Sequence, residues 1–549
     1  MNEPAESGLA LPISTSRPRA RATIGWQQLW VLVAIFAVAA GLRVSLFDRS
    51  GLWTDEIFSL AIATGHSLEH PAAAAQPELG DFVEPDHPIA AQELNRYVEH
   101  QSPLESPARV VRAVVLSDTN PPLYYLLLYG WTLVLGTSDM ALRLFSTACS
   151  LACFPFMVEI ARRTGGKAAV LPACVLFGIS PIAIYYSVEG RMYSLLWLFV
   201  LALAWISLVI RQNRGGIGFL ALWVLISAGG FLTHYFFVFP WFAIVVYLIA
   251  RPGRLERQHL LLCMLVMGAL LIPWYINLPG SLARWRITKD WLKFAPPDYG
   301  LLDSLRRMVY MFFASWDKRL WLGYRWSNII PVLLFGVIAG LMLWKMRSRV
   351  LAHGRLLLAL LFLAGCAGPF VFDLVQHTYT IAWPRYAISA LPAAYLLVAA
   401  GLACLPRRVS AILLALVALA WVPNLLGLSR TRFWWAPPRT IAEVASRNRT
   451  ASDLILIHSI PSGFISIARY VQGPAPVASW IEQLGNRQVP GSLRSLARGR
   501  TSVVFVKVHE AGSLDPEADW LRAHANVSRQ TRVGLVNVTD FRPRGSETF

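Results

Sequence analysis

Residues 26–60 read WQQLWVLVAIFAVAAGLRVSLFDRSGLWTDEIFSL, a stretch that joins a hydrophobic span directly to a pair of acids. The span from Trp26 to Phe47 is about long enough to cross a bilayer as a helix, which takes about 20 residues. Asp55 and Glu56 follow it among apolar neighbours such as Trp53 and Phe58. We expect these neighbours to hold the two carboxylates against the membrane interface, where they could act on a lipid-borne substrate.

Composition places the chain among polytopic membrane proteins. It has 549 residues, of which 55% are hydrophobic, and a mean hydropathy of +0.48. That is more apolar side chain than a soluble protein can bury. The cysteines all lie in apolar segments without metal-ligand spacing, so we expect packing roles and neither disulfides nor a zinc site. They are Cys149, Cys153, Cys174, Cys263, Cys366 and Cys404.

The net charge of +18 divides into small basic clusters between hydrophobic spans, which is typical of cytoplasmic loops and argues against nucleic-acid binding. We predict about eleven transmembrane helices, with the N-terminus cytoplasmic and the C-terminus external. The predicted spans are 26–47, 140–160, 168–185, 191–210, 217–235, 236–250, 260–278, 327–344, 356–375, 386–404 and 409–428.

The segment from Asp48 to Thr119 carries twelve acids and four arginines, so it should face the external side. The apolar run from Pro121 to Gly136 is ambiguous. If it were a span, Arg162 and Arg163 would lie outside and every later loop would be inverted. We therefore predict a juxtamembrane helix, which the double proline at its start also favours.

Three regions follow from this topology. Residues 1–25 are a cytoplasmic tail, and residues 26–428 are a transmembrane catalytic domain with an external loop at 48–139 and a basic external loop at 279–326. Residues 429–549 have the composition of a soluble α/β domain outside the membrane. In that domain we predict strands at 453–458, 502–508 and 532–538, and helices at 439–449, 461–471 and 515–525.

Polar residues from distant spans converge on the external side: Asp55, Glu56, Asn120, Arg143, Glu189, Arg191 and Arg385. Three of these have structural alternatives, because Glu189 and Arg191 could form an ion pair at a helix start and Arg143 could extend to the interface.

The loop from Pro279 to Trp326 carries nine basic residues against four aspartates, although it is external. Binding an anionic phosphate or pyrophosphate would explain this charge, and contact with anionic lipids is the alternative. The histidines at 66, 70, 87 and 100 resemble scattered loop residues more than a metal site.

Four stretches resemble the GT-C glycosyltransferases, specifically the bacterial relatives of protein O-mannosyltransferases and lipid A aminoarabinose transferases, glycosyltransferase family 39. They are WTDEIFSLA (53–61), NPPLYYLLLYGW (120–131), ALRLFS (141–146) and YYSVEGRMYSL (185–195), with a weaker RYAISALPA (385–393). The resemblance covers the first 210 residues well and the rest mainly by architecture. It implies a GT-C fold with juxtamembrane helices in the first external loop.

The resemblance also implies a function: transfer of a sugar from a polyprenyl-phosphate carrier to an acceptor on the external face. Asp55 would be the general base, Glu56 would orient the acceptor or the base, and Arg143 would contact the donor phosphate. Glu189 and Arg191 would shape the site, and Asn120, Tyr124 and Arg385 are assigned to donor phosphate or sugar binding. Asn120 departs from the His or Lys frequent before PPLYY in the relatives, so phosphate binding could shift to Arg143, Arg385 or the basic loop.

No cofactor is required by this chemistry, and a divalent metal is possible but not indicated. The expected partners are the lipid donor, a lipid, glycan or protein acceptor, and membrane lipids, with no nucleic acid. We expect a bacterial inner membrane location.

The rival functional class is a transporter or lipid flippase, for which Asp373 is the nearest candidate acid. A non-catalytic assembly protein would leave the motif order unexplained. The sugar and the acceptor are not readable from the sequence.

Overall fold

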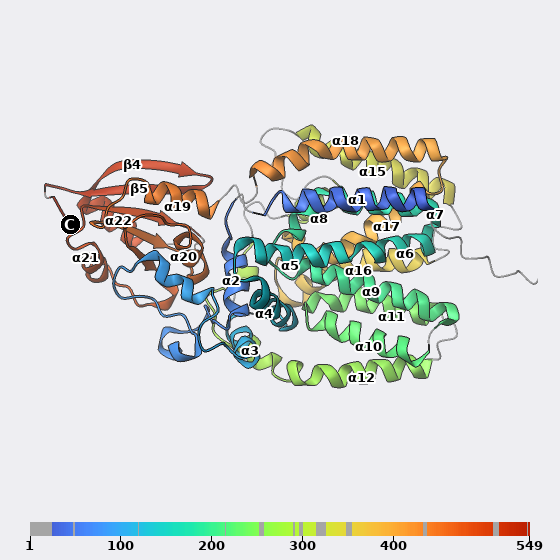
Figure 1. Ribbon diagram of the computed structural model, residues 1–549, viewed down its shortest axis with the longest axis horizontal. Helices are drawn as coiled ribbons and strands as arrows, with labels where there is room; N and C mark the ends of the chain where they lie inside the picture. The colour runs from blue at the N-terminus through green and yellow to red at the C-terminus, as the bar shows by residue number, and fades with distance from the viewer. Residues whose placement is uncertain are drawn as a thin grey trace, which may run out of the picture.

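The structure is a computed structural model that describes residues 25–47, 50–118, 120–214, 216–251, 257–288, 291–295, 300–313, 325–346, 354–431, 436–508, 515–545 and 547–549. Most of the predicted cytoplasmic tail lies outside these residues, as do Lys289, Trp316, Lys318, Arg319 and Trp321 of the basic loop. Figure 1 shows a bundle of lengthwise helices with a mixed sheet domain at one end.

Seven helices of the described residues are long and apolar enough to cross a membrane, or eight if one bent pair is a single span. Helices lie at each of the eleven predicted positions, although the number of spans itself stays a prediction. The elements are α1 (Trp26–Val44), α5 (Asp139–Ala152) with α6 (Phe154–Gly165), α7 (Lys167–Ile179) with α8 (Pro181–Ser187), α9 (Tyr193–Val209), α10 (Ile217–Phe231), α11 (Val238–Ala250), α12 (Arg257–Tyr275), α15 (Arg325–Met346), α16 (Arg355–Gln376), α17 (Leu391–Leu402) and α18 (Arg407–Thr431).

The bent pair α7 and α8 has a local cause. Pro181 has no N–H, so the helix breaks there with a bend of 59° and leaves carbonyl groups of the preceding turn without helical partners. Arg43 of α1, fully buried, donates to one of these carbonyls, Gly178 O, at 2.9 Å, and to Ser187 Oγ at 2.9 Å. A buried arginine in the first span therefore stabilises the break.

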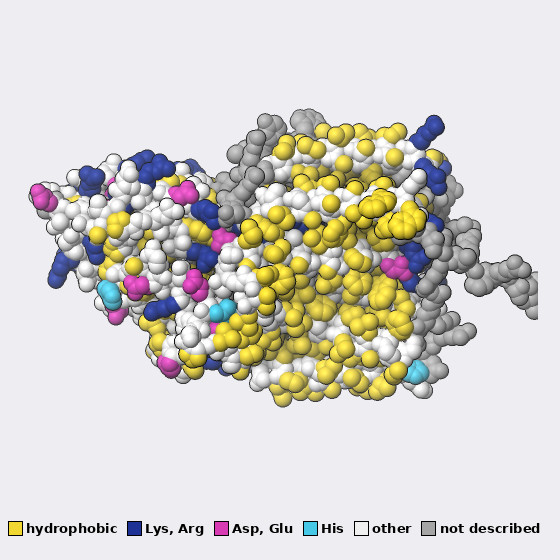
Figure 2. Space-filling model, viewed as in Figure 1, with side chains coloured by type: hydrophobic (Ala, Val, Ile, Leu, Met, Phe, Trp, Pro, Cys, Tyr) yellow, Lys and Arg dark blue, Asp and Glu magenta, His cyan; other side chains and the backbone are white. Residues whose placement is uncertain are grey.

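The surface of the bundle is apolar. Figure 2 shows hydrophobic side chains covering the helices almost continuously, whereas charged side chains gather on the sheet domain and at the opposite end of the bundle. Large exposed side chains such as Leu270 of α12 and Leu419 of α18 belong to this surface. Without water in a bilayer core, only helices with this kind of surface can cross it. The helical bundle is therefore the membrane part of the protein.

A layer of shorter helices lies between the bundle and the sheet domain. It contains α2 (Thr54–Ala63), α3 (Pro107–Ser117) and α4 (Leu123–Leu135). Helix α4 begins directly after Pro121-Pro122, within the stretch predicted to be juxtamembrane, and Figure 1 shows it nearly end-on while the bundle helices run lengthwise. It does not run parallel to the membrane spans.

The sheet domain has the strand order β2-β1-β3-β5-β4, in which β2, β1 and β3 are parallel and β5 and β4 are antiparallel. The strands are β1 (Asp453–His458), β2 (Val477–Trp480), β3 (Ser502–Lys507), β4 (Ala525–Val533) and β5 (Val536–Pro543). The helices are α19 (Pro438–Ser446), α20 (Pro461–Ala468), α21 (Gly491–Ala497) and α22 (Pro516–His524).

The predicted small α/β domain is confirmed, with one strand placed wrongly. The strand predicted at 532–538 straddles a tight hairpin turn, where Gly534 has a φ of +64° and Val533 pairs with Val536. A glycine inside an apparently continuous strand pattern supplied the positive φ that such a turn needs. Strand β2 and helix α21 were not predicted.

The sheet domain is fastened to the layer that carries the acidic pair. Tyr470 donates from its hydroxyl to Asp139 Oδ2 at 2.5 Å and accepts from the backbone N–H of Leu52 at 2.7 Å. Ser466 donates to Leu52 O at 2.6 Å, and Arg469 donates to Asp139 Oδ1 at 3.1 Å. The sheet domain thus holds the backbone three residues before Asp55.

Glu69 of the first external loop gives a prediction for this layer. Its side chain is buried, and its Oε2 accepts from Thr288 N at 3.1 Å and Thr288 Oγ1 at 2.8 Å. Burial raises the pKa of Glu69 to about 7, against an ordinary value of 4.5. The folded protein therefore binds this proton more tightly than the unfolded chain does. The stability it contributes is complete below about pH 4.5 and is lost as the pH rises through about 7.

We expect Glu69→Gln to remove this component, so the thermal midpoint of the variant should fall less than that of the wild type between pH 5 and pH 8. Thermal unfolding in one detergent across this range measures it. Glu78→Gln, a change at an exposed acid of the same loop, should behave as the wild type. Parallel curves for Glu69→Gln and the wild type would contradict the assignment.

Candidate active site

The site begins at the first turn of α2, where the acidic pair divides between two environments. Successive residues of a helix point about 100° apart. Glu56 accordingly turns inward and is fully buried, whereas the side chain of Asp55 is 29% exposed. The two adjacent carboxylates therefore have different neighbours.

Glu56 forms a buried ion pair with Arg143 of α5. Arg143 Nε donates to Glu56 Oε1 at 2.9 Å and Nη2 donates to Oε2 at 2.6 Å, a bidentate arrangement between two fully buried side chains. The arginine also donates to the carbonyl of Phe47 and, at 2.6 Å, to that of Gly51. Glu56 further accepts from Gly190 N at 3.0 Å. The pair thus joins the end of the first span, α2, α5 and the connection between α8 and α9.

Asp55 faces Arg385, which lies 330 residues away in sequence. Arg385 Nη1 donates to Asp55 Oδ2 at 3.0 Å. The other oxygen, Asp55 Oδ1, has no hydrogen bond among the residues that the structure describes. The guanidinium of Arg385 lies over the rings of Trp291 and Tyr386, at 4.9 and 5.6 Å from their centroids. Aromatic faces of this kind stabilise a cation and fix its orientation.

Arg191 forms the second cationic position beside Asp55. Its Nη1 donates to Ser59 Oγ at 3.1 Å and to Tyr125 Oη at 3.3 Å, and its Nη2 lies 3.8 Å from Asp118 Oδ2. Tyr125 also donates to Asp118. The charge of Asp55 is close enough to act electrostatically on Arg191. One carboxylate with an open oxygen therefore lies close to two arginines, of which Arg191 is buried and Arg385 is partly buried.

The other predicted residues lie around this group. Asn120 donates to Asp118 Oδ1 from its backbone N–H at 3.1 Å and from its side chain at 3.0 Å. Tyr124 is fully buried and packs edge-on against Tyr125. Glu189 is buried close to Tyr186 and Tyr193. All the predicted site residues thus come from the same end of the bundle.

The contacts of Arg143 and Arg191 bear on the alternatives considered from sequence. Arg143 is buried against Glu56 and does not extend to the interface. Its predicted contact with the donor phosphate stays a prediction, because four of its N–H groups already have acceptors in this structure. Arg191 lies beside Asp118, an acid from the end of the first external loop.

Sequence reasoning missed Asp118 and Ser59 as members of the site, and it did not place Trp291 against Arg385. Asp118 carried one signal, since it lies two residues before the Asn-Pro-Pro stretch. Ser59 lies one turn after Asp55 on the same helix face and could have been found from that spacing. Trp291 lies in the basic loop, and nothing local in the sequence connects it to Arg385.

Two other groups have structural roles. Asp373, the candidate acid of the transporter hypothesis, accepts from the hydroxyls of Thr378 and Thr380 and from the backbone N–H of Thr380 and Ile381, at 2.6 to 2.9 Å. These bonds cap the end of α16. His100 lies between Glu105, at 3.2 Å, and Thr132 Oγ1, at 3.0 Å.

Comparison with known proteins agrees with this architecture. Residues 119–276 match the family model described as dolichyl-phosphate-mannose-protein mannosyltransferase. The structure is similar to that of ArnT from Cupriavidus metallidurans in the apo state, with a TM-score of 0.55, 12% identity, and coverage of 94% of this chain and 98% of that chain. No curated protein sequence matches the chain.

The crystal structure of the same ArnT bound to undecaprenyl phosphate gives a TM-score of 0.56 at 14% identity, again covering 94% of this chain and 98% of that chain. The predicted GT-C fold is confirmed: a mostly helical membrane part with a small C-terminal sheet domain. The predicted resemblance to the protein mannosyltransferase and ArnT type is confirmed as well.

Removing Arg143 should destabilise the protein strongly, because Glu56 would remain as a buried charge without its partner. We expect Arg143→Ala to lower the free energy of unfolding by about 3–5 kcal/mol. The matched control is Arg162→Ala, which removes an arginine paired with Glu159 where both side chains are about one quarter exposed. That change should cost about 1 kcal/mol or less. Denaturant unfolding of purified protein compares them, and equal losses would contradict the role given to the pair.

Proposed function

We propose that this chain is an integral-membrane glycosyltransferase that transfers a sugar from a polyprenyl-phosphate donor, with Asp55 as the general base. The observation that carries the proposal is the environment of Asp55: one oxygen is held by Arg385 and the other is open, with Arg191 close by. The fold shared with ArnT, a protein whose crystal structure contains undecaprenyl phosphate, supports the lipid class of the donor.

The reaction needs a base on one side of the sugar and cations on the other. An acceptor hydroxyl donates its proton to Asp55 Oδ1 as its oxygen attacks the anomeric carbon. The bond between that carbon and the phosphate oxygen breaks, and the polyprenyl phosphate leaves with the bonding electrons. A single displacement of this kind inverts the anomeric configuration and requires no nucleophilic residue of the protein.

Arg191 and Arg385 are the cations that the geometry offers to the leaving phosphate. Both have a buried Nε without a hydrogen-bond partner among the described residues. Charge develops on the phosphate oxygen as the bond breaks, and positioned guanidinium groups stabilise it more in a dry site than in water. Arg385 therefore has two functions, which are to orient Asp55 and to contact the donor.

Glu56 and Arg143 act on this site through the position of α2. The buried pair fixes the first turn of α2 and so the direction in which Asp55 points. We assign Asn120, Tyr124 and Glu189 to the wall that receives the donor phosphate or sugar. The predicted contact of Arg143 with the phosphate would require its bonds to Glu56 or to the backbone carbonyls to change when the donor binds.

We place the active side of the membrane part at the end covered by the sheet domain, and we propose that this end is periplasmic in a bacterial inner membrane. The charge pattern of the loops supports this orientation. The three predicted regions, at 1–25, 26–428 and 429–549, remain part of the proposal. Mannose, aminoarabinose, uronic acids and hexosamines are candidate sugars, and lipid, glycan and protein hydroxyls or phosphates are candidate acceptors.

The proposal predicts that Asp55→Asn lowers kcat by about 10²- to 10⁴-fold, because the amide accepts a proton far less readily than the carboxylate. The assay follows release of undecaprenyl phosphate from undecaprenyl-phosphate sugars carrying each candidate sugar, in membranes that contain the acceptors. Asp86→Asn, at an exposed acid of the same external loop, is the control and should retain activity. Unchanged turnover in a folded Asp55→Asn protein would remove Asp55 as the base.

Arg385→Ala should weaken binding of undecaprenyl phosphate by about 10- to 100-fold, since a hydrogen bond to a charged group contributes about 1.5–3 kcal/mol. Arg385→Lys keeps the charge without the planar donor pair, so its affinity should lie between the two. Titration of detergent-solubilised protein with the lipid measures this, with Arg522→Ala at an exposed arginine of α22 as the control. Wild-type affinity in Arg385→Ala would assign the phosphate to other residues.

A further inference from the structure

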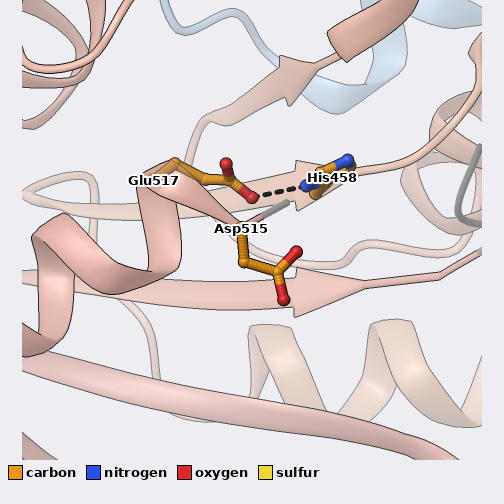
Figure 3. A group of neighbouring side chains, drawn as sticks. All are labelled: His458, Asp515 and Glu517. Carbon is orange, nitrogen blue, oxygen red and sulfur yellow. Dashed lines mark hydrogen bonds and ion pairs between the residues drawn. The ribbon is translucent and has the colours of Figure 1, made fainter. Parts of the chain in front are cut away.

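Three side chains with metal-ligand chemistry converge in the C-terminal sheet domain, away from the proposed active site. His458 ends β1, Asp515 directly precedes α22, and Glu517 lies in its first turn. One ligand atom from each lies within 4.8 Å of those from the other two. Figure 3 shows the Glu517 carboxylate directed at the imidazole of His458, with the Asp515 side chain beside them.

The strand pattern explains how His458 reaches this position. Alternate residues of a strand point to opposite faces of the sheet. Leu454 and Leu456 pack in the core beneath α21 and α22, so His458 shares that face. The two acids come from the start of α22, since Asp515 directly precedes the helix and Glu517 lies in its first turn. The neighbouring strand β3 ends in Lys507, which pairs with His458 in the parallel register.

The burial of Glu517 and His458 argues against a chance group of polar side chains. The side chain of Glu517 is fully buried and that of His458 is 3% exposed. The imidazole Nδ1 and Glu517 Oε1 are hydrogen-bonded, whereas Glu517 Oε2 is buried with no hydrogen-bond partner among the described residues. A buried carboxylate oxygen without a partner is costly, because it has lost water and gained nothing in return.

A structural ion pair is the simpler explanation for part of the cluster. His458 and Glu517 could join α22 to the sheet, and Asp515 already pairs with Lys507. That explanation leaves Glu517 Oε2 unsatisfied. The pair with Lys507 accounts for the place of Asp515, since Lys507 lies beside His458 in the sheet. A cation bound by the three side chains would give Glu517 Oε2 a partner, and the 4.8 Å separation of the ligand atoms allows one.

We propose that His458, Asp515 and Glu517 form a Zn²⁺ site that fastens the start of α22 to the carboxyl end of β1. Imidazole nitrogen with carboxylate oxygen is a ligand set that suits zinc, whereas magnesium and calcium prefer oxygen ligands alone. Two carboxylates balance the charge of the ion. Three protein ligands leave a fourth tetrahedral position for water. Asp515 exchanges Lys507 for the metal when the ion binds.

The site is tested with the untagged full-length protein in detergent, stripped with EDTA, dialysed against zinc, and analysed for bound metal. We expect one zinc per chain in the wild type. Asp515→Asn, at a side chain about one third exposed, and Glu517→Gln should each weaken zinc binding by at least about tenfold. The control is His524→Asn, at an exposed histidine of the same helix, which should bind as the wild type does.

Two further measurements separate loss of ligands from loss of fold. Zinc should raise the thermal midpoint of the wild type and of His524→Asn but not that of Asp515→Asn. Co²⁺ in place of zinc should give a visible absorption band in the wild type that Asp515→Asn lacks. Absence of bound zinc in the wild type would overturn the proposal. Equal zinc affinity in the wild type and in folded Asp515→Asn would overturn it as well. This comparison holds even if Glu517→Gln fails to fold.

Discussion

The buried pair between Glu56 and Arg143 is the interaction on which the rest of the site depends. It joins elements that are 87 residues apart in sequence and holds carbonyls at both ends of the connection between the first span and α2. A charged pair without water is stable only if nearly all its hydrogen bonds are made. These bonds therefore allow only one arrangement of the α2 start, and Asp55 is directed outward as a consequence.

The sheet domain completes this arrangement from the other side. Tyr470 and Ser466 hold the backbone at Leu52, while Arg469 and Tyr470 bind Asp139 at the start of α5. The connection that leads into α2 is thus fixed between the bundle and the sheet domain. The C-terminal domain therefore has a positioning role for the site. None of the predicted catalytic groups comes from this domain.

Local patterns in the sequence predicted the helices, the strands at 453–458 and 502–508, and the gathering of Asp55, Arg143, Glu189, Arg191 and Arg385 at one end of the bundle. They did not predict the partners within that group. Whether Arg143 faces Glu56 or a lipid phosphate depends on packing between α2 and α5, which no local pattern records. Asp118 was missed for the same reason, as was the packing of Trp291 on Arg385, and the hairpin at Gly534 was hidden in a continuous strand pattern.

We propose that Asp55, Arg191 and Arg385 surround the reacting bond between sugar and lipid phosphate. An electron cryo-microscopy structure of the protein in nanodiscs with undecaprenyl phosphate tests it most directly. Phosphate density is expected within hydrogen-bond distance of Arg191 and Arg385, with the open oxygen of Asp55 across the space that the sugar would occupy. Phosphate density held elsewhere, with Asp55 out of reach of a sugar attached to it, would contradict these roles.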